Sequence, residues 1–171
     1  MSRTTTIWRI TITALMSALI FVLTVFLRIP TPVGGYVHLG DVGITFAALA
    51  FGPWIAAAAG GLGTALADIS GGYAQFAFFS FLVHGVQGVA VGLIVRRKLE
   101  LPALALAVVV GALIVTGGYF LVEVVLYGMG EAFVELVPNM IQGLVGGVIG
   151  VPLYMTVRKA YPPLSRYRGP M

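Results

Sequence analysis

Long apolar runs constrain this chain more than any other feature of its sequence. The segments 10–27, 76–95 and 101–127 contain one carboxylate, Glu123, and no lysine or arginine. A helix needs about 20 apolar residues to cross the hydrocarbon core of a bilayer, and each run is close to that length or longer. Charged residues make up only 9% of the chain, whereas soluble domains carry about 25%. The sequence therefore predicts an integral membrane protein without a separate soluble domain.

The order of runs and breaks predicts an all-α bundle in one transmembrane domain. The first run exceeds the apolar core of a secretory signal peptide, so we expect a retained first helix. The segment 28–40 carries Pro30 and Pro32 and is expected to be a loop. The domain is expected to span residues 1–171, with long helices over 7–27, 76–95, 101–127 and 133–157.

Two apolar pieces, 42–51 and 54–69, are shorter than a usual membrane span and are separated by Gly52-Pro53. They form either two short spans or one re-entrant hairpin, so the pattern is compatible with six spans or with four. Six transmembrane helices, with a short second and third helix, is the preferred interpretation.

Basic residues predict the orientation, because cytoplasmic loops of membrane proteins are enriched in lysine and arginine. With six spans, only Arg28 falls on the outer side, and four spans give the same sidedness. Both termini are therefore expected in the cytoplasm, and the loops around Gly34, Gly71 and Gly130 outside. The net charge of +4 is explained by this cytoplasmic rim and requires no nucleic acid. The nine residues on the inner side are Arg3, Arg9, Arg96, Arg97, Lys98, Arg158, Lys159, Arg166 and Arg168.

Missing motifs argue against an enzyme. The chain has no cysteine, so disulfides, thiolate metal sites and thiol nucleophiles are excluded. It has no phosphate-binding Gly-x-x-x-x-Gly-Lys-Ser/Thr loop and no His-Glu-x-x-His pattern. We expect no cofactor and no metal, and any ATP must be hydrolysed by another chain.

Polar side chains recur at helical spacing inside three of the predicted spans. Polar groups in hydrocarbon are costly and usually face a cavity. The rise of 1.5 Å per residue places the three groups at a common depth of roughly 7–17 Å below the outer surface. They predict an outward-opening cup for a small polar molecule. The groups are Ser80, His84 and Gln87; Tyr119, Glu123 and Tyr127; and Asn139, Gln142 and Gly146.

The members of this cup differ in how strongly they indicate binding. For His84 or Gln87 alone, an interhelical hydrogen bond is as good an explanation as a ligand contact. Glu123 indicates ligand binding more strongly than packing, because an unpaired carboxylate in the membrane costs several kcal/mol and no lysine or arginine lies there. Tyr127 fits better as a residue of the membrane–water interface.

Two further carboxylates lie at predicted helix ends. Asp68 either caps the turn before Gly71 or forms a pocket wall. Asp41 precedes an apolar run and is expected to be a helix N-cap, a structural role.

Three strings of the sequence resemble the substrate-binding S components of energy-coupling factor (ECF) vitamin transporters. They are Gly-Tyr-Val-His-Leu-Gly-Asp at 35–41, Phe-Gly-Pro at 51–53 and Gly-Leu-Gly-Thr-Ala-Leu-Ala-Asp at 61–68. The resemblance covers essentially the whole chain. It also includes Ala14 and Ala18 of the first helix, where that family docks on its membrane partner.

The resemblance implies a bacterial plasma-membrane protein that captures a vitamin at its outer face. It implies as partners a transmembrane T component and two ATPases, besides membrane lipid. The family's ligand lies among the outer loops and the last three helices, where the polar cup is predicted. The expected binding residues are Glu123, Tyr119, Asn139, Gln142, His84, Gln87, Asp68, Tyr36 and His38.

The expected substrate is a small heteroaromatic, because Glu123 can accept a hydrogen bond from an amino or ring N–H while Tyr119 stacks on the ring. A hydroxymethylpyrimidine-like thiamin precursor fits best. Riboflavin, pantothenate, pyridoxine and cobalamin are alternatives within the family. Two other classes are an intramembrane enzyme that uses Glu123 and His84 as acid and base, and an accessory protein that binds no ligand.

Overall fold

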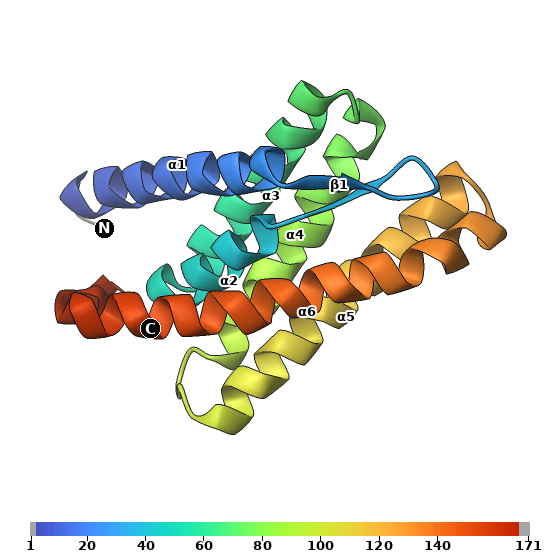
Figure 1. The fold of residues 1–171 in the computed structure, drawn as a ribbon. Coiled ribbons are helices and arrows are strands. Elements are labelled where there is room, and N and C mark those ends of the chain that lie inside the picture. The colour runs from blue at the N-terminus through green and yellow to red at the C-terminus, as the bar shows by residue number, and fades with distance from the viewer. Residues whose placement is uncertain (1–2, 168–171) are drawn as a thin grey trace.

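A computed structural model describes residues 3–167 and contains six α-helices, a short hairpin and a terminal 3-10 helix (Figure 1). The hairpin pairs two three-residue strands antiparallel, with Ile29 opposite Val37. The elements in chain order are α1 (Arg3–Phe26), β1 (Arg28–Pro30), β2 (Tyr36–His38), α2 (Gly40–Phe51), α3 (Pro53–Gly71), α4 (Ala74–Ile94), α5 (Leu101–Leu126), α6 (Met129–Ala160) and η1 (Pro162–Tyr167).

Four of these helices, α1, α4, α5 and α6, are long and apolar enough to cross a membrane. Their outer faces carry many exposed large apolar side chains, such as Leu113, Leu121 and Val137, which in a bilayer contact lipid. The prediction of a helical membrane protein is confirmed. The count of six spans and the side on which the termini lie stay predictions.

The helix positions agree with the sequence pattern to within a few residues. α6 runs from Met129 to Ala160 without a break and includes Pro138 and Pro152. The expected loop 28–40 contains the two strands, which are too short to produce an alternating apolar pattern.

The short helices α2 and α3 are joined at Gly52, whose φ of 87° lies in the left-handed region that glycine adopts without strain. Pro53 then begins α3 at a position where its missing N–H is not needed. α2 has 12 residues and covers about 18 Å, less than the hydrocarbon core. The Gly52-Pro53 pair therefore reverses the chain between two helices, as the sequence indicates.

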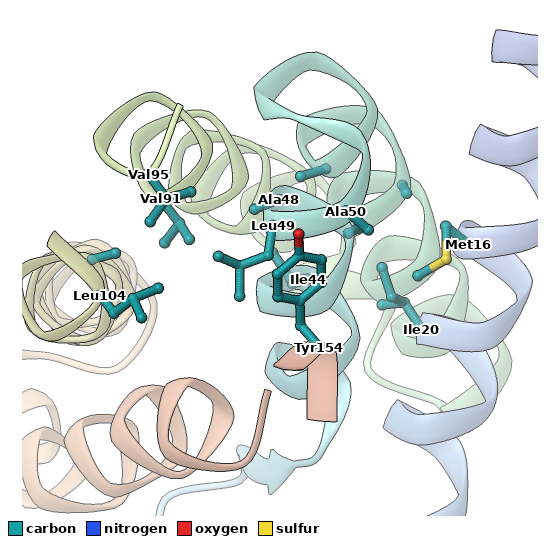
Figure 2. Close-up of a cluster of buried hydrophobic side chains, with 14 of the residues drawn as sticks. Met16, Ile20, Ile44, Ala48, Leu49, Ala50, Val91, Val95, Leu104 and Tyr154 are labelled. Carbon is teal, nitrogen blue, oxygen red and sulfur yellow. The ribbon is translucent and has the colours of Figure 1, made fainter. Parts of the chain in front are cut away.

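Buried apolar side chains from all six α-helices and from η1 form the main core. Figure 2 shows Ile44 and Leu49 of α2 together with Tyr154 of α6 and Ile20 of α1 in this cluster. Glycines allow close helix approach within the chain: a Cβ on Gly143 would lie 2.5 Å from Ala112 Cα. The glycine spacing of α6 therefore serves packing inside this protein.

The two ends of the bundle differ. Figure 1 shows the start of α1 and the end of α6 at one end, whereas the hairpin and the turn between α5 and α6 lie at the other. Each end has a cavity, and the one beside the hairpin is lined by six of the nine predicted binding residues.

Candidate functional site

A small cavity lies between the hairpin and four helices. Its volume is about 20 Å³, room for about one water molecule. β2, the end of α3, the first half of α4, the second half of α5 and the first half of α6 surround it. The lining residues are Gly35, Tyr36, His38, Asp68, Phe76, Ser80, Tyr119, Glu123, Glu135 and Asn139.

Glu123, like Asp68, is a carboxylate of the cavity wall with one buried oxygen that has no hydrogen-bond partner. Its side chain is only 4% exposed, and its Oε1 accepts a hydrogen bond from Asn139 Nδ2 at 3.1 Å. Its Oε2 is buried without a hydrogen-bond partner. A buried polar atom without a partner costs about 1–3 kcal/mol, so this oxygen can accept a donor from a bound molecule at a net gain.

A chain of polar contacts leads from the cavity wall into the bundle. Ser80 Oγ lies 2.6 Å from the hydroxyl of Tyr119, which lies 3.2 Å from His84 Nε2. On the other side of the ring, His84 Nδ1 lies 2.9 Å from Gln87 Oε1 and 3.2 Å from Asp41 Oδ1. Because Nδ1 faces two oxygen acceptors, it carries the proton, and in the neutral ring Nε2 accepts from Tyr119.

Asp41 corrects one sequence-based expectation. The N-cap of α2 is Leu39, without a side-chain capping bond, and Asp41 lies inside the first turn. The carboxylate is fully buried against His84. The predicted capping role is therefore wrong: the local pattern could not reveal a histidine on another helix.

The hairpin is attached to α6 by two hydrogen bonds. Glu135 Oε1 accepts from the backbone N–H of Val33 at 3.2 Å, and Gln142 Oε1 accepts from that of His38 at 3.0 Å. Sequence reasoning missed Glu135, although it lies four residues before Asn139 and so on the same helix face. These bonds position β2 over the cavity.

Tyr36 connects the hairpin to α3. Its hydroxyl donates a hydrogen bond to Asp68 Oδ1, while the guanidinium of Arg28 lies 4.5 Å from the centre of its ring. Burial, and then the neighbouring Asp68, raise the pKa of Tyr36, so its hydroxyl stays protonated and donates. In the turn to α4, the backbone carbonyl of Asp68 accepts hydrogen bonds from the N–H groups of Gly72 and Tyr73. The side chain of Asp68 lines the cavity instead.

His38 is buried beside the cavity and is uncharged at neutral pH. Its Nδ1 accepts a hydrogen bond from Gly40 N at 3.0 Å. Burial lowers its pKa from 6.5 to about 3, the nearby Arg28 and His84 act in the same direction, and Asp41 opposes them. A neutral ring at this position presents no cation to a ligand.

The nine predicted binding residues form two layers. Tyr36, His38, Asp68, Tyr119, Glu123 and Asn139 line the cavity. His84, Gln87 and Gln142 are fully or almost fully buried behind it and hydrogen-bond each other or the lining. Tyr127 is half-buried against Phe76, with ring centres 6.0 Å apart, and is not among the lining residues. Within residues 3–167 no cluster of histidine and carboxylate side chains is arranged to hold a metal ion.

Comparison with known proteins identifies the family. A family model described as "ECF-type riboflavin transporter, S component" matches residues 4–159. The thiamine precursor transporter HmpT of Lactococcus lactis subsp. cremoris is 36% identical over 143 residues, which cover 82% of each chain. An uncharacterized protein of Pyrococcus woesei is 36% identical over 144 residues, covering 84% of this chain and 97% of that one. The chain therefore belongs to the family of ECF transporter S components, and it is a multi-pass transport protein of the plasma membrane rather than an enzyme.

Proposed function

We propose that this S component captures a hydroxymethylpyrimidine-like thiamin precursor in the cavity beside the hairpin. The observation that carries the proposal is Glu123 Oε2, a buried acceptor without a partner in the wall of a polar cavity. An aminopyrimidine offers an amino N–H to this oxygen and a flat ring to Tyr119. The relative HmpT, named as a thiamine precursor transporter, supports the same substrate class.

The binding residues are proposed in two roles. Glu123, Asn139, Asp68, Tyr36, His38 and Tyr119 contact the ligand, since they line the cavity. His84, Gln87 and Gln142 hold lining residues in place from behind. A pyrimidine is larger than the present cavity of about 20 Å³, so its binding displaces the surrounding side chains.

Riboflavin is the second candidate substrate, because the description of the matched family names it. The three fused rings of a flavin need much more space than a single pyrimidine ring. A flavin would therefore have to displace more of the lining side chains than a pyrimidine does.

We further propose a single six-span domain with both termini in the cytoplasm. α2 begins beside His38 in the outer cavity and ends at Phe51, whereas α3 begins at Pro53 and ends beside Asp68. Each short helix thus runs between the two ends of the bundle, which supports two spans over a re-entrant hairpin. Arg168, one of the nine basic residues expected on the cytoplasmic side, is not among the residues that the structure describes.

Import is proposed to use a transmembrane T component and two ATPases, as the family implies. The chain itself has no nucleotide-binding loop. Ala14 and Ala18 are proposed as the docking surface, because both are exposed on α1 and small residues allow a partner helix to approach closely.

Mass spectrometry of small molecules released from the purified protein tests the capture function. We expect a pyrimidine precursor of thiamin, and its loss from Glu123→Gln protein purified in parallel. A flavin would assign riboflavin instead. Calorimetry with both compounds then gives the affinities, and binding of neither would contradict the proposal.

A further inference from the structure

A second cavity, of about 280 Å³, lies at the opposite end of the bundle from the vitamin site. Its volume is close to the lower limit of about 300 Å³ for small-molecule sites. It is formed where the start of α1, the turn between α2 and α3, the end of α4 and η1 meet. Nothing in the proposed capture of a vitamin uses it. Six of its lining residues carry the argument: Trp8, Arg9, Trp54, Arg96, Arg166 and Tyr167.

All charged side chains that line this cavity in the described part of the chain are arginines. Three guanidinium groups line it, and none of the six acidic residues of the chain does. Within residues 3–167, Arg96 and Arg166 form no ion pair with a carboxylate. Guanidinium groups bind phosphate through paired hydrogen bonds, so three arginines around one cavity indicate a phosphate-bearing ligand.

The backbone adds to this positive potential. The turn at Gly52 and Pro53, which begins the 19-residue helix α3, is part of the lining. The N-terminus of α3 has no side-chain cap, and Trp54 and Ile55 lie in its first turn, where backbone N–H groups have no partner inside the helix. Such an end attracts anions through its free donors and its dipole.

Aromatic side chains form the remaining wall. Trp8 stacks on Tyr167, with ring centres 5.3 Å apart, and meets Phe51 edge-on at 6.2 Å. Trp54, which also lines the cavity, is 73% exposed. Tryptophan and tyrosine are enriched where a membrane protein meets the headgroup region. The cavity therefore joins a phosphate-binding set to an interfacial apolar wall.

We propose that this cavity binds the phosphate of an anionic phospholipid headgroup. The three arginines and the start of α3 receive the phosphate, and the glycerol and upper acyl carbons lie along Trp54 and Pro53. A phospholipid is favoured over free phosphate because the cavity is far larger than one phosphate ion and its wall is partly apolar.

Intrinsic tryptophan fluorescence tests this site selectively. The chain has two tryptophans, Trp8 and Trp54, and both line this cavity. Phosphatidylglycerol titrated into the full chain in neutral detergent should change the emission saturably. Phosphatidylcholine at the same concentration should not, and inorganic phosphate should act only at far higher concentration.

Two arginine variants provide the specificity control. Arg96→Gln combined with Arg166→Gln should weaken phosphatidylglycerol binding at least about tenfold, since each basic contact with an anionic lipid contributes about 1 kcal/mol. Arg97→Gln, which removes one positive charge next to Arg96 in the chain but outside the cavity lining, should bind like the parent chain. Unchanged vitamin binding in the double variant shows that it is folded.

Several results would overturn the proposal. Equal responses to phosphatidylcholine and phosphatidylglycerol would leave no role for the arginines. A response to inorganic phosphate at the lipid concentration would assign a free anion. Unchanged binding by the double variant would place the lipid elsewhere, and a signal that requires the ATPase-bearing complex would make the cavity a protein contact.

Discussion

His84 and Asp41 form a fully buried pair that joins α4 to α2, with 3.2 Å between His84 Nδ1 and Asp41 Oδ1 and neither side chain exposed. The same histidine contacts Tyr119 of the cavity wall through its other ring nitrogen. The pair thus connects the cavity wall to the short helix that begins beside the hairpin. It fixes the orientation of the ring and, through it, the hydroxyl of Tyr119.

Asp41→Asn is expected to lower stability, because the variant keeps the shape of the side chain and removes its charge. The cost should be about 1–3 kcal/mol, the range for a buried group that loses its partner, and the thermal midpoint in detergent should fall by several degrees. The double variant Asp41→Asn with His84→Gln should lose less than the two single variants together, as expected for a coupled pair.

The exposed pair of Lys98 and Glu100 provides the control for this experiment. These side chains are 69% and 65% exposed and lie 3.4 Å apart. Glu100→Gln should not measurably change the midpoint. Additive effects of Asp41→Asn and His84→Gln would show that the two residues act separately.

The sequence predicts the long helices well, because uninterrupted apolar runs have few alternatives in a membrane. Spacing alone also predicts the three polar groups of the cup, on α4, α5 and α6, since residues three or four apart share a helix face. Their meeting around one cavity could only be inferred from their common depth.

Residues whose role depends on tertiary contacts were harder to predict. Asp41 resembles a helix cap in its local sequence, and its partner His84 is 43 positions away. Glu135 has the right spacing but lies near a helix end, where a carboxylate is unremarkable. The arginine-lined cavity brings together four chain segments, and no local pattern indicates such a site.

Glu123→Gln should weaken binding of the captured ligand by about 1.5–3 kcal/mol, or roughly ten- to a hundredfold in Kd. The variant keeps a hydrogen-bonding partner for Asn139 but removes the charge that strengthens the bond to a ligand N–H. Calorimetry with the ligand identified by mass spectrometry measures this effect.

Glu131→Gln is the matched control, because Glu131 is an exposed carboxylate in the first turn of α6. The Glu131→Gln variant should bind the captured ligand with the same affinity as the parent chain. Equal affinity of Glu123→Gln would instead assign Glu123 to helix packing, and the polar anchor would then be sought at Asp68 or His84.

His38 should make the protein less stable as the pH falls below 6.5. Its pKa is about 3 in the folded state and 6.5 when exposed, so between these values the unfolded chain binds the extra proton and unfolding becomes easier. His38→Asn removes the titration while its Oδ1 can still accept the bond from Gly40 N. The thermal midpoints of the two chains should therefore diverge progressively from pH 6.5 downward, and parallel curves would contradict the buried, neutral assignment.

Replacing Ala14 and Ala18 by leucine should abolish co-purification with the ATPase-bearing complex and vitamin uptake. Larger side chains prevent the close crossing that small residues allow. Ligand affinity of the isolated subunit should stay within about threefold, or ~0.7 kcal/mol. Ala105→Leu, on the exposed surface of α5, should co-purify normally. Loss of ligand binding by the α1 variant would indicate internal packing.

Single cysteines should establish the sidedness, because the natural chain has no cysteine and gives no background. Gly130 lies in the first turn of α6, and a side chain added there meets no atom within 4 Å. Gly130→Cys should therefore react with an impermeant thiol reagent in whole cells, whereas a cysteine at the exposed Lys98 should react only after the membrane is opened. These two positions are preferable to Gly71, where an added Cβ would collide with the guanidinium of Arg28. Labelling of the Lys98 position in intact cells would reverse the orientation, and with it the assignment of the vitamin cavity to the outer face.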